Sequence, residues 1–301
     1  MRDKASSGVM IAGMVVSWAI YYACSKYAVD ATGSAFAAGL ALRSAALIFL
    51  TAQLISEKKL GQVLRQGRAA LILLAIGVLG YLLDAFANLG YGAGSLGTGT
   101  ALLKTDVLMA NIATVVIYKK RLYLSDWLGT LVMLTGVLLV LDVSFGTMSF
   151  NWYDLFFIAS ALCVTANAFI IKAAQLKYRV DTDMIAYYNN FVVLLLFFVS
   201  ALLTGDISSL PAAGAMGFWG IALLGGLAQT MIYYFYYANL KRFEVFIVKL
   251  YLLLMPVLSA VIGIMFLGES MTGKKALGVA VILGGAAVIL LRERLNKRAA
   301  A

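Results

Sequence analysis

The stretch AALILLAIGVLGYLLDAFANLGYG, residues 69–92, contains one charged side chain, Asp84. About 20 consecutive apolar residues are enough for a helix to cross the hydrocarbon core of a bilayer. This stretch is longer than that and carries a single charge, so it predicts a transmembrane helix. Similar stretches fill most of the chain.

The composition of the whole chain agrees with this interpretation. Of 301 residues, 63% are hydrophobic and 13% are charged, and the mean hydropathy is +0.93. A soluble domain has about 45–50% apolar and about 25% charged residues. The charged groups are too few to cover a water-facing surface. We therefore predict an all-α membrane protein. Its ten transmembrane helices are expected near residues 8–28, 36–56, 69–91, 96–118, 124–142, 152–172, 184–204, 215–238, 244–267 and 274–291.

Lysine and arginine are concentrated in every second loop and at both termini. Segments 29–35, 92–95, 143–151 and 205–214 contain neither residue, whereas the intervening loops are basic; Lys274 and Lys275 are the exception. Since basic loops stay on the cytoplasmic side, both termini are expected in the cytoplasm, in a bacterial inner membrane. These loops also account for the net charge of +10 without a nucleic-acid partner.

The two halves of the chain resemble each other. A shift of 145 residues aligns Gly80 with Gly225, Asp84 with Gln229 and Lys104 with Lys249; a shift of 146 aligns Lys26 with Lys172; a shift of 149 aligns Gly129 with Gly278 and Gly136 with Gly285. Each half, residues 1–148 and 149–301, would hold five helices. Because five is odd, the second half must cross the membrane in the inverted sense, as in many secondary transporters.

Several short motifs resemble a known family. They are Tyr237-Ala-Asn-Leu-Lys-Arg, Pro256-Val257, Gly268-Glu269, Leu277-Gly278 and Ile282-Leu-Gly-Gly285, together with Leu40-Ala-Leu-Arg43. In this order they resemble the drug/metabolite transporter superfamily in its ten-helix, EamA-like form, with some similarity to the triose-phosphate and nucleotide-sugar branch. The first half departs from the pattern, because it has no counterpart of Pro256 and has Lys120 near the place of Glu269. The resemblance implies alternating access around a central cavity, in families that carry sugar phosphates, nucleotide sugars, amino acids or drugs.

Five charged side chains fall inside the expected helices: Arg43, Asp84, Lys104, Asp106 and Lys249. A charge near the centre of the bilayer costs roughly 2.5–3.5 kcal/mol on insertion scales, so such groups usually face a cavity or a partner. We expect these residues to define the functional site.

Lys104 and Lys249 are the candidates for binding an anionic group. Lys104 shares a helical face with Asn111, and the two lysines resemble the phosphate-binding lysines of the triose-phosphate branch. Two alternatives remain at this point: Lys104 could form a buried ion pair, and Lys249 could extend to the membrane interface.

Asp84 shares a helical face with Asn88 and could pair with Lys104, bind a substrate ammonium or carry a proton. Asp106 points about 200° away from Lys104 around the helix, so we expect it to form a structural pair, neutralised by Arg43.

The remaining candidate cavity residues are polar or aromatic side chains at Tyr22, Asn167, Gln229 and Tyr233. Tyr236, Tyr237 and the segment 187–190 are expected at the membrane interface, where aromatic side chains gather. Pro256 and Glu269 are expected to take part in gating, Pro256 by allowing a bend.

The predicted function is therefore secondary transport of a small polar metabolite, an organic anion or zwitterion. The alternatives are a proton-coupled exporter of amino acids or amphipathic metabolites, and a lipid flippase. The expected partners are the substrate and the bilayer, for a monomer or homodimer. With no histidine, nucleophile motif or ATP-binding motif in the sequence, we expect neither an enzyme nor a metal or cofactor.

Overall fold

The computed structural model describes residues 2–93, 99, 102–119, 122–140, 152–211, 215–258 and 272–299. These ranges contain ten α-helices and no strand. Six of the helices, α1, α2, α3, α7, α8 and α9, are long and apolar enough to cross a membrane. The helices are α1 (Arg2–Thr32), α2 (Ala35–Ser56), α3 (Ala70–Ala93), α5 (Asp106–Tyr118), α6 (Leu124–Val140), α7 (Asp154–Leu176), α8 (Thr182–Thr204), α9 (Met216–Arg242), α10 (Val245–Leu252) and α12 (Gly273–Ala299). The expected all-α membrane architecture is confirmed.

Local sequence explains where the helices begin and end. The Ser34 hydroxyl accepts hydrogen bonds from the first backbone N–H groups of α2, and the Asp181 carboxylate caps α8 in the same way. α8 ends at Gly205, whose φ of +78° is a left-handed conformation that glycine adopts readily.

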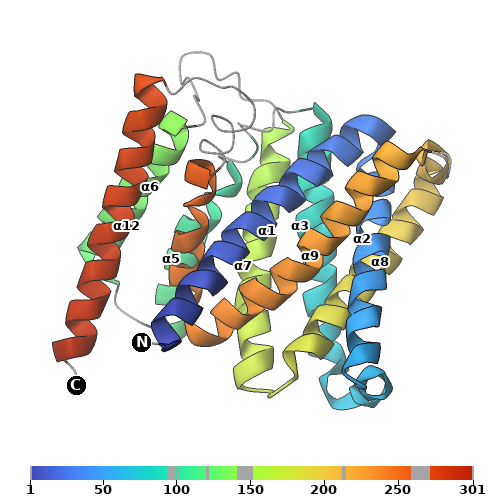
Figure 1. The fold of residues 1–301 in the computed structure, drawn as a ribbon, viewed down its shortest axis with the longest axis horizontal. Coiled ribbons are helices and arrows are strands. Elements are labelled where there is room, and N and C mark those ends of the chain that lie inside the picture. The colour runs from blue at the N-terminus through green and yellow to red at the C-terminus, as the bar shows by residue number, and fades with distance from the viewer. Residues whose placement is uncertain are drawn as a thin grey trace.

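The helices of the two halves pack reciprocally. α1 lies along α9, and its counterpart α7 lies along α3; likewise α2 packs on α9, and α8 packs on α3. The first two helices of each half therefore lie against the third helix of the other half, as an inverted repeat requires. Figure 1 shows α1 and α9 side by side, and the two chain ends at the same end of the bundle.

α6 and α12 form a separate pair at one edge of the bundle (Figure 1). A Cβ on Gly136 would lie 2.9 Å from the carbonyl oxygen of Gly278, and one on Gly285 would lie 3.4 Å from that of Gly129. The shift of 149 pairs Gly136 with Gly285 and Gly129 with Gly278. The contact of Gly136 with Gly278 is therefore the repeat equivalent of the contact of Gly285 with Gly129. Small residues let two helix backbones approach closely within a membrane.

Lys26 and Lys172 play matching parts in the two halves. Lys26 Nζ donates to the carbonyl oxygen of Tyr91, near the end of α3, at 3.3 Å. Lys172 Nζ donates to the carbonyl oxygen of Leu240, near the end of α9, at 3.0 Å. Tyr91 and Leu240 are separated by the shift of 149 residues. A lysine supports the C-terminal end of a helix because it satisfies carbonyl groups that lack a helical partner.

Two expected helices are interrupted by turns. In the region predicted as 96–118, a turn at Lys104–Thr105 precedes α5; in the region predicted as 244–267, a turn at Leu253–Leu254 follows α10. The second turn has a clear cause, because Pro256 has no N–H to donate to the carbonyl of Leu252.

The position of these turns corrects the alignment of the two lysines. The turns are related by the shift of 149, which pairs Lys104 with Leu253 and not with Lys249. Lys104 and Lys249 are thus not repeat counterparts, because the change of shift from 145 to 149 occurs before α10.

Candidate functional site

The first buried charge cluster, the arginine cluster, consists of Arg43, Asp84, Tyr21, Asn190 and Tyr233. Arg43 Nε donates to Asp84 Oδ2 at 2.8 Å, and Tyr21 donates to the same oxygen at 2.7 Å. Arg43 Nη1 also lies 2.6 Å from the Tyr233 hydroxyl and 3.4 Å from Asn190 Oδ1. Since Arg43 and Asp84 are 3% and 4% exposed, this is a buried, closed and electrically neutral network.

This geometry corrects two predictions about Arg43 and Asp84. Asp84 pairs with Arg43 and not with Lys104, and Arg43 does not neutralise Asp106. Removing one partner of such a buried pair is strongly unfavourable because the other charge is left without compensation. Asp84 therefore has a structural partner in this conformation.

The second buried charge cluster, the lysine cluster, consists of Lys104, Asp106 and Lys249. Lys249 Nζ lies 2.8 Å from Asp106 Oδ2. The expectation that Asp106 forms a structural pair holds, with Lys249 as the partner. Lys249 is 0% exposed, so the alternative that it reaches the membrane interface is wrong.

Lys104 differs from the other buried cations. It is 3% exposed, and its Nζ contacts the sulfur of Met255 at 3.2 Å and the ring of Tyr22 at 5.7 Å from the centroid. Within the part of the chain that the structure describes, no carboxylate lies within ion-pair distance of it. The alternative of a buried ion pair therefore finds no support there, and the lysine cluster has a net charge of +1.

Aromatic side chains hold the two lysines around a common centre. Lys104 lies over Tyr22, and Lys249 lies over Tyr236 at 5.6 Å. The rings of Tyr22 and Tyr236 both pack on Trp18, at centroid distances of 5.2 and 5.9 Å. Cations gain electrostatic stabilisation over aromatic faces, so Trp18 and its neighbours organise the cluster without adding negative charge.

A small central cavity lies beside this aromatic group. Its volume is about 30 Å³, room for about two water molecules and too small for a metabolite. Trp18 Nε1, Asn167 Oδ1 and Gln229 Oε1 line it and have no hydrogen-bond partner among the described atoms. The wall also includes Arg43, Asn189, Tyr233, Tyr236 and Tyr237. A polar wall with unused hydrogen-bonding groups suits a polar ligand once the cavity widens.

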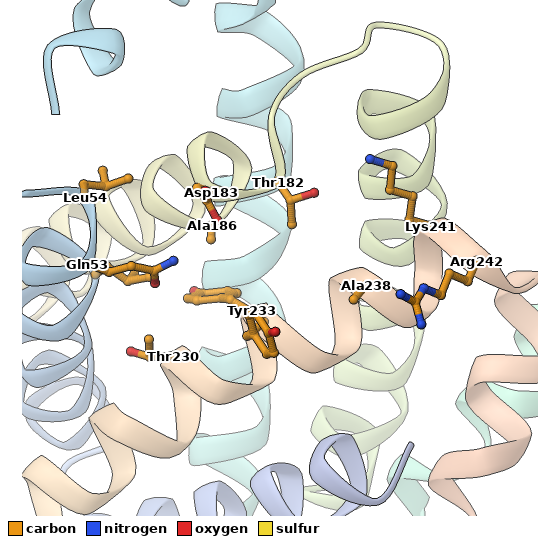
Figure 2. A pocket seen from close by; sticks show the side chains of 12 residues that line it. Gln53, Leu54, Thr182, Asp183, Ala186, Thr230, Tyr233, Ala238, Lys241 and Arg242 are labelled. Carbon is orange, nitrogen blue, oxygen red and sulfur yellow. The ribbon is translucent and has the colours of Figure 1, made fainter. Parts of the chain in front are cut away.

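A larger vestibule of about 260 Å³ opens between α2, α8 and α9. Figure 2 shows its lining, which includes Gln53, Thr182 and Asp183 and ends at Lys241 and Arg242. Tyr233 belongs to both the vestibule and the central cavity. Its side chain therefore stands between the two spaces, held by the hydrogen bond to Arg43.

The other predicted site residues are divided between the site and the packing between helices. Asn88 accepts from Ser25 Oγ at 2.6 Å and donates to the carbonyl oxygen of Ala35, so it joins α1, α2 and α3. Asn111 donates to Thr130 Oγ1 of α6 at 3.0 Å and does not line the central cavity. Pro256 follows the turn after α10, whereas Glu269 and the proposed boundary at 148/149 lie outside the described residues.

Three interfacial assignments are wrong. Tyr236 and Tyr237 are each 2% exposed and line the central cavity, and Asn190 is completely buried against Arg43. Sequence reasoning also missed Trp18 and Met255, which contact the site from α1 and from the segment after α10. An alternation of large aromatic and small residues around Trp18 was the available signal, but such alternation is common in membrane helices.

Comparison with known proteins agrees with this fold. Residues 6–142 and 151–291 each match the model of the EamA-like transporter family. An uncharacterized transporter of Bacillus subtilis (strain 168), YdfC, is 26% identical over 231 residues, 74% of this chain and 73% of that protein. A solved structure titled "Crystal structure of protein" has a TM-score of 0.74 and 20% identity, over 97% of this chain and 99% of that one.

The reciprocal helix packing and the buried polar centre define a multi-pass membrane transporter with an inverted repeat. Because the family matches cover nearly the whole chain, it belongs to the EamA-like transporter family, within the drug/metabolite transporter superfamily.

Proposed function

We propose that this transporter carries a small organic anion by secondary, alternating-access transport, and that Lys104 binds the anionic group. The observation that carries the proposal is the burial of Lys104 without a carboxylate partner in the described structure. An uncompensated buried ammonium is costly, so a bound anion would supply its missing counter-charge.

The surroundings of Lys104 support this role. Trp18, whose ring packs on the Tyr22 ring beside Lys104, has an Nε1 donor with no hydrogen-bond partner among the described atoms. α5 begins directly after the turn at Lys104–Thr105, so the positive end of its dipole lies at the same place. Both features favour a polar ligand with a negative group.

The access route that we propose runs through the vestibule. Tyr233 separates the vestibule from the central cavity and hydrogen-bonds to Arg43. Movement of α9 relative to α2 and α8 would displace Tyr233 and join the two spaces. The inverted repeat then offers the equivalent opening toward the other side.

The membrane orientation follows from the basic loops. The vestibule lies at the end that bears Lys241, Arg242 and the basic segment 57–69, with both termini, so we assign this end to the cytoplasm. The chain has two cysteines, Cys24 and Cys163. In a cysteine-free variant, a single cysteine at Lys58 should react only from the inside of right-side-out vesicles, and one at Ser208 only from the outside; the reverse pattern, or labelling of both from one side, would contradict the assignment.

The test of the proposed function is ligand binding by the purified protein. We expect sugar phosphates or carboxylates to raise the thermal unfolding temperature, because a ligand that binds the native state stabilises it by mass action. Lys104→Met should abolish this shift, and Lys59→Met, which removes a partly exposed lysine outside the lysine cluster, should retain it.

The opposite result would favour the alternative function. Stabilisation by amino acids or amphipathic amines that is unchanged in Lys104→Met, and lost in Asp84→Asn at unchanged stability, would contradict anion binding at Lys104. It would instead indicate a proton-coupled exporter. The pairing of Asp84 with Arg43 argues against that outcome.

A further inference from the structure

We propose that Asp106 sets the charge of the transported anion, so that the site selects monovalent over divalent anions. The inference rests on the proposed function, because it assumes that an anion binds at Lys104. It follows from the geometry of the lysine cluster, in which the one carboxylate pairs with Lys249 and Lys104 contacts a methionine sulfur instead.

The first step is the charge of the cluster. Lys249 and Asp106 neutralise each other at 2.8 Å in a setting where their exposure is 0% and 5%. Lys104 interacts electrostatically with both of them, without a carboxylate of its own within the described ranges. One positive charge therefore remains, and one negative charge balances it.

The second step concerns the other buried charges. The described buried charged residues outside the lysine cluster are Arg43, Asp84 and Asp126. Arg43 and Asp84 form a neutral pair. Asp126 accepts a hydrogen bond from the backbone N–H of Tyr123 at the start of α6. None of them adds a free positive charge, so a second negative charge on the substrate would be buried without compensation.

The third step concerns a free acceptor. Asp106 Oδ1 is buried and has no hydrogen-bond partner in the described part of the chain. A carboxylate oxygen only accepts hydrogen bonds. It would thus accept a bond from the substrate, which favours a monovalent anion that carries a hydroxyl group, such as a hydroxy acid.

The experiment compares ligands of matched shape and different charge. Tartrate and phthalate are divalent near neutral pH, and their monomethyl esters are monovalent. Isothermal titration of the purified protein should give a lower dissociation constant for at least one monoester than for its parent, with binding lost in Lys104→Met.

The decisive variant is Asp106→Asn, which raises the charge of the cluster to +2. It should shift the ratio of the two dissociation constants toward the divalent anion on the order of 10- to 100-fold, the effect of a unit charge at close range in a partly polar interior. Removing both members of the pair, in Asp106→Asn/Lys249→Met, restores a charge of +1 and should return the ratio toward its original value.

A variant with the pair intact keeps the test decisive if Asp106→Asn does not fold. Met255→Lys adds a positive charge beside Lys104 and should shift the ratio in the same direction. Anion binding that depends on Lys104, with a ratio unchanged in either variant, would overturn the inference and leave the proposed function standing. Failure of these probes, and of the sugar phosphates and carboxylates of the thermal test, to bind the wild type would overturn both.

Discussion

The arginine cluster and the lysine cluster are both buried, yet they are built differently. In the first, Arg43 and Asp84 neutralise each other; Tyr21 donates a hydrogen bond to Asp84, and Arg43 donates one to the Tyr233 hydroxyl. In the second, Lys104 contacts a methionine sulfur and an aromatic ring, and the carboxylate of the cluster, Asp106, pairs with Lys249. The first arrangement is complete without a ligand, whereas the second is not.

This difference separates structural from functional charges. Burial of a charge inside a membrane protein raises the expectation of function, but four of the five buried charges considered from sequence are paired within the protein. Lys104 is the member of this group whose burial has no internal explanation in the described structure. Substitutions in each cluster test this difference directly.

The largest effect is expected from Arg43→Met. It leaves Asp84 buried without its partner and removes the bonds to Tyr233 and Asn190, so the free energy of unfolding should fall by about 3–5 kcal/mol. Denaturant unfolding in detergent measures this. The double variant Arg43→Met/Asp84→Leu removes both charges and should recover part of the loss; no recovery would mean that the ion pair is not the main contribution.

A slightly smaller loss, about 3 kcal/mol, is expected from Lys249→Met. Here Asp106 remains buried without the contact at 2.8 Å. Unfolding of Lys249→Met, Asp106→Asn and the double variant forms a double-mutant cycle. A coupling energy near zero would show that the two side chains do not act as a pair.

A matched pair of tyrosine variants compares the clusters at a finer level. Tyr233→Phe removes a hydrogen bond to Arg43 and should cost about 1.5–3 kcal/mol, the usual range for a bond to a charged group. Tyr22→Phe keeps an aromatic face beneath Lys104 and should change the unfolding free energy by less than about 1 kcal/mol. Equal losses in the two variants would remove the distinction between the clusters.

The smallest effect is expected at the partly exposed ion pairs of Lys59 with Glu57 and Asp183. Lys59→Ala should cost no more than about 1 kcal/mol, and less at high salt. The hydrogen bond to Asp183 raises the pKa of Lys59, and the bond from Lys59 lowers the pKa of Glu57.

The pH dependence of this small contribution has a definite sign. A lowered carboxyl pKa contributes stability above its ordinary value and loses it as the pH falls; a raised lysine pKa contributes below its ordinary value and loses it at high pH. The difference between wild type and Lys59→Ala should therefore be flat near neutral pH and shrink in acid. A difference that grows in acid would contradict this assignment.

Much of the fold could be predicted from the sequence. Apolar length predicts α2, α3, α6, α7, α8 and α9 within a few residues of their observed bounds, and the glycines at a shift of 149 meet as reciprocal contacts between α6 and α12. Lys26 and Lys172 also occupy matching places in the two halves. These features depend on composition and spacing along the chain, which the sequence contains directly.

The site was predictable as a set of residues but not as a set of pairs. Arg43, Asp84, Lys104, Asp106 and Lys249 were all expected to matter, yet the partner expected for Asp106 was wrong, and the partner considered for Asp84 was not the observed one. Pairing depends on the rotation of each helix and on the turns near Lys104 and Pro256, and a rotation of one residue, about 100°, changes which neighbour a side chain meets. The alignment of Lys104 with Lys249 failed for a related reason. The shift between the two halves changes from 145 to 149 residues within an apolar region, where the sequences align almost equally well at either shift.

The central claim is that Lys104 is a buried charge retained for a ligand and not for stability. The most direct measurement is the free energy of unfolding of Lys104→Met without any ligand, beside the wild type in the same detergent. The account predicts a value equal to or higher than that of the wild type, because the variant removes an uncompensated charge and fills the space with an apolar side chain. A loss of about 3 kcal/mol or more, as expected for Lys249→Met, would show that Lys104 has a stabilising partner and would contradict the account.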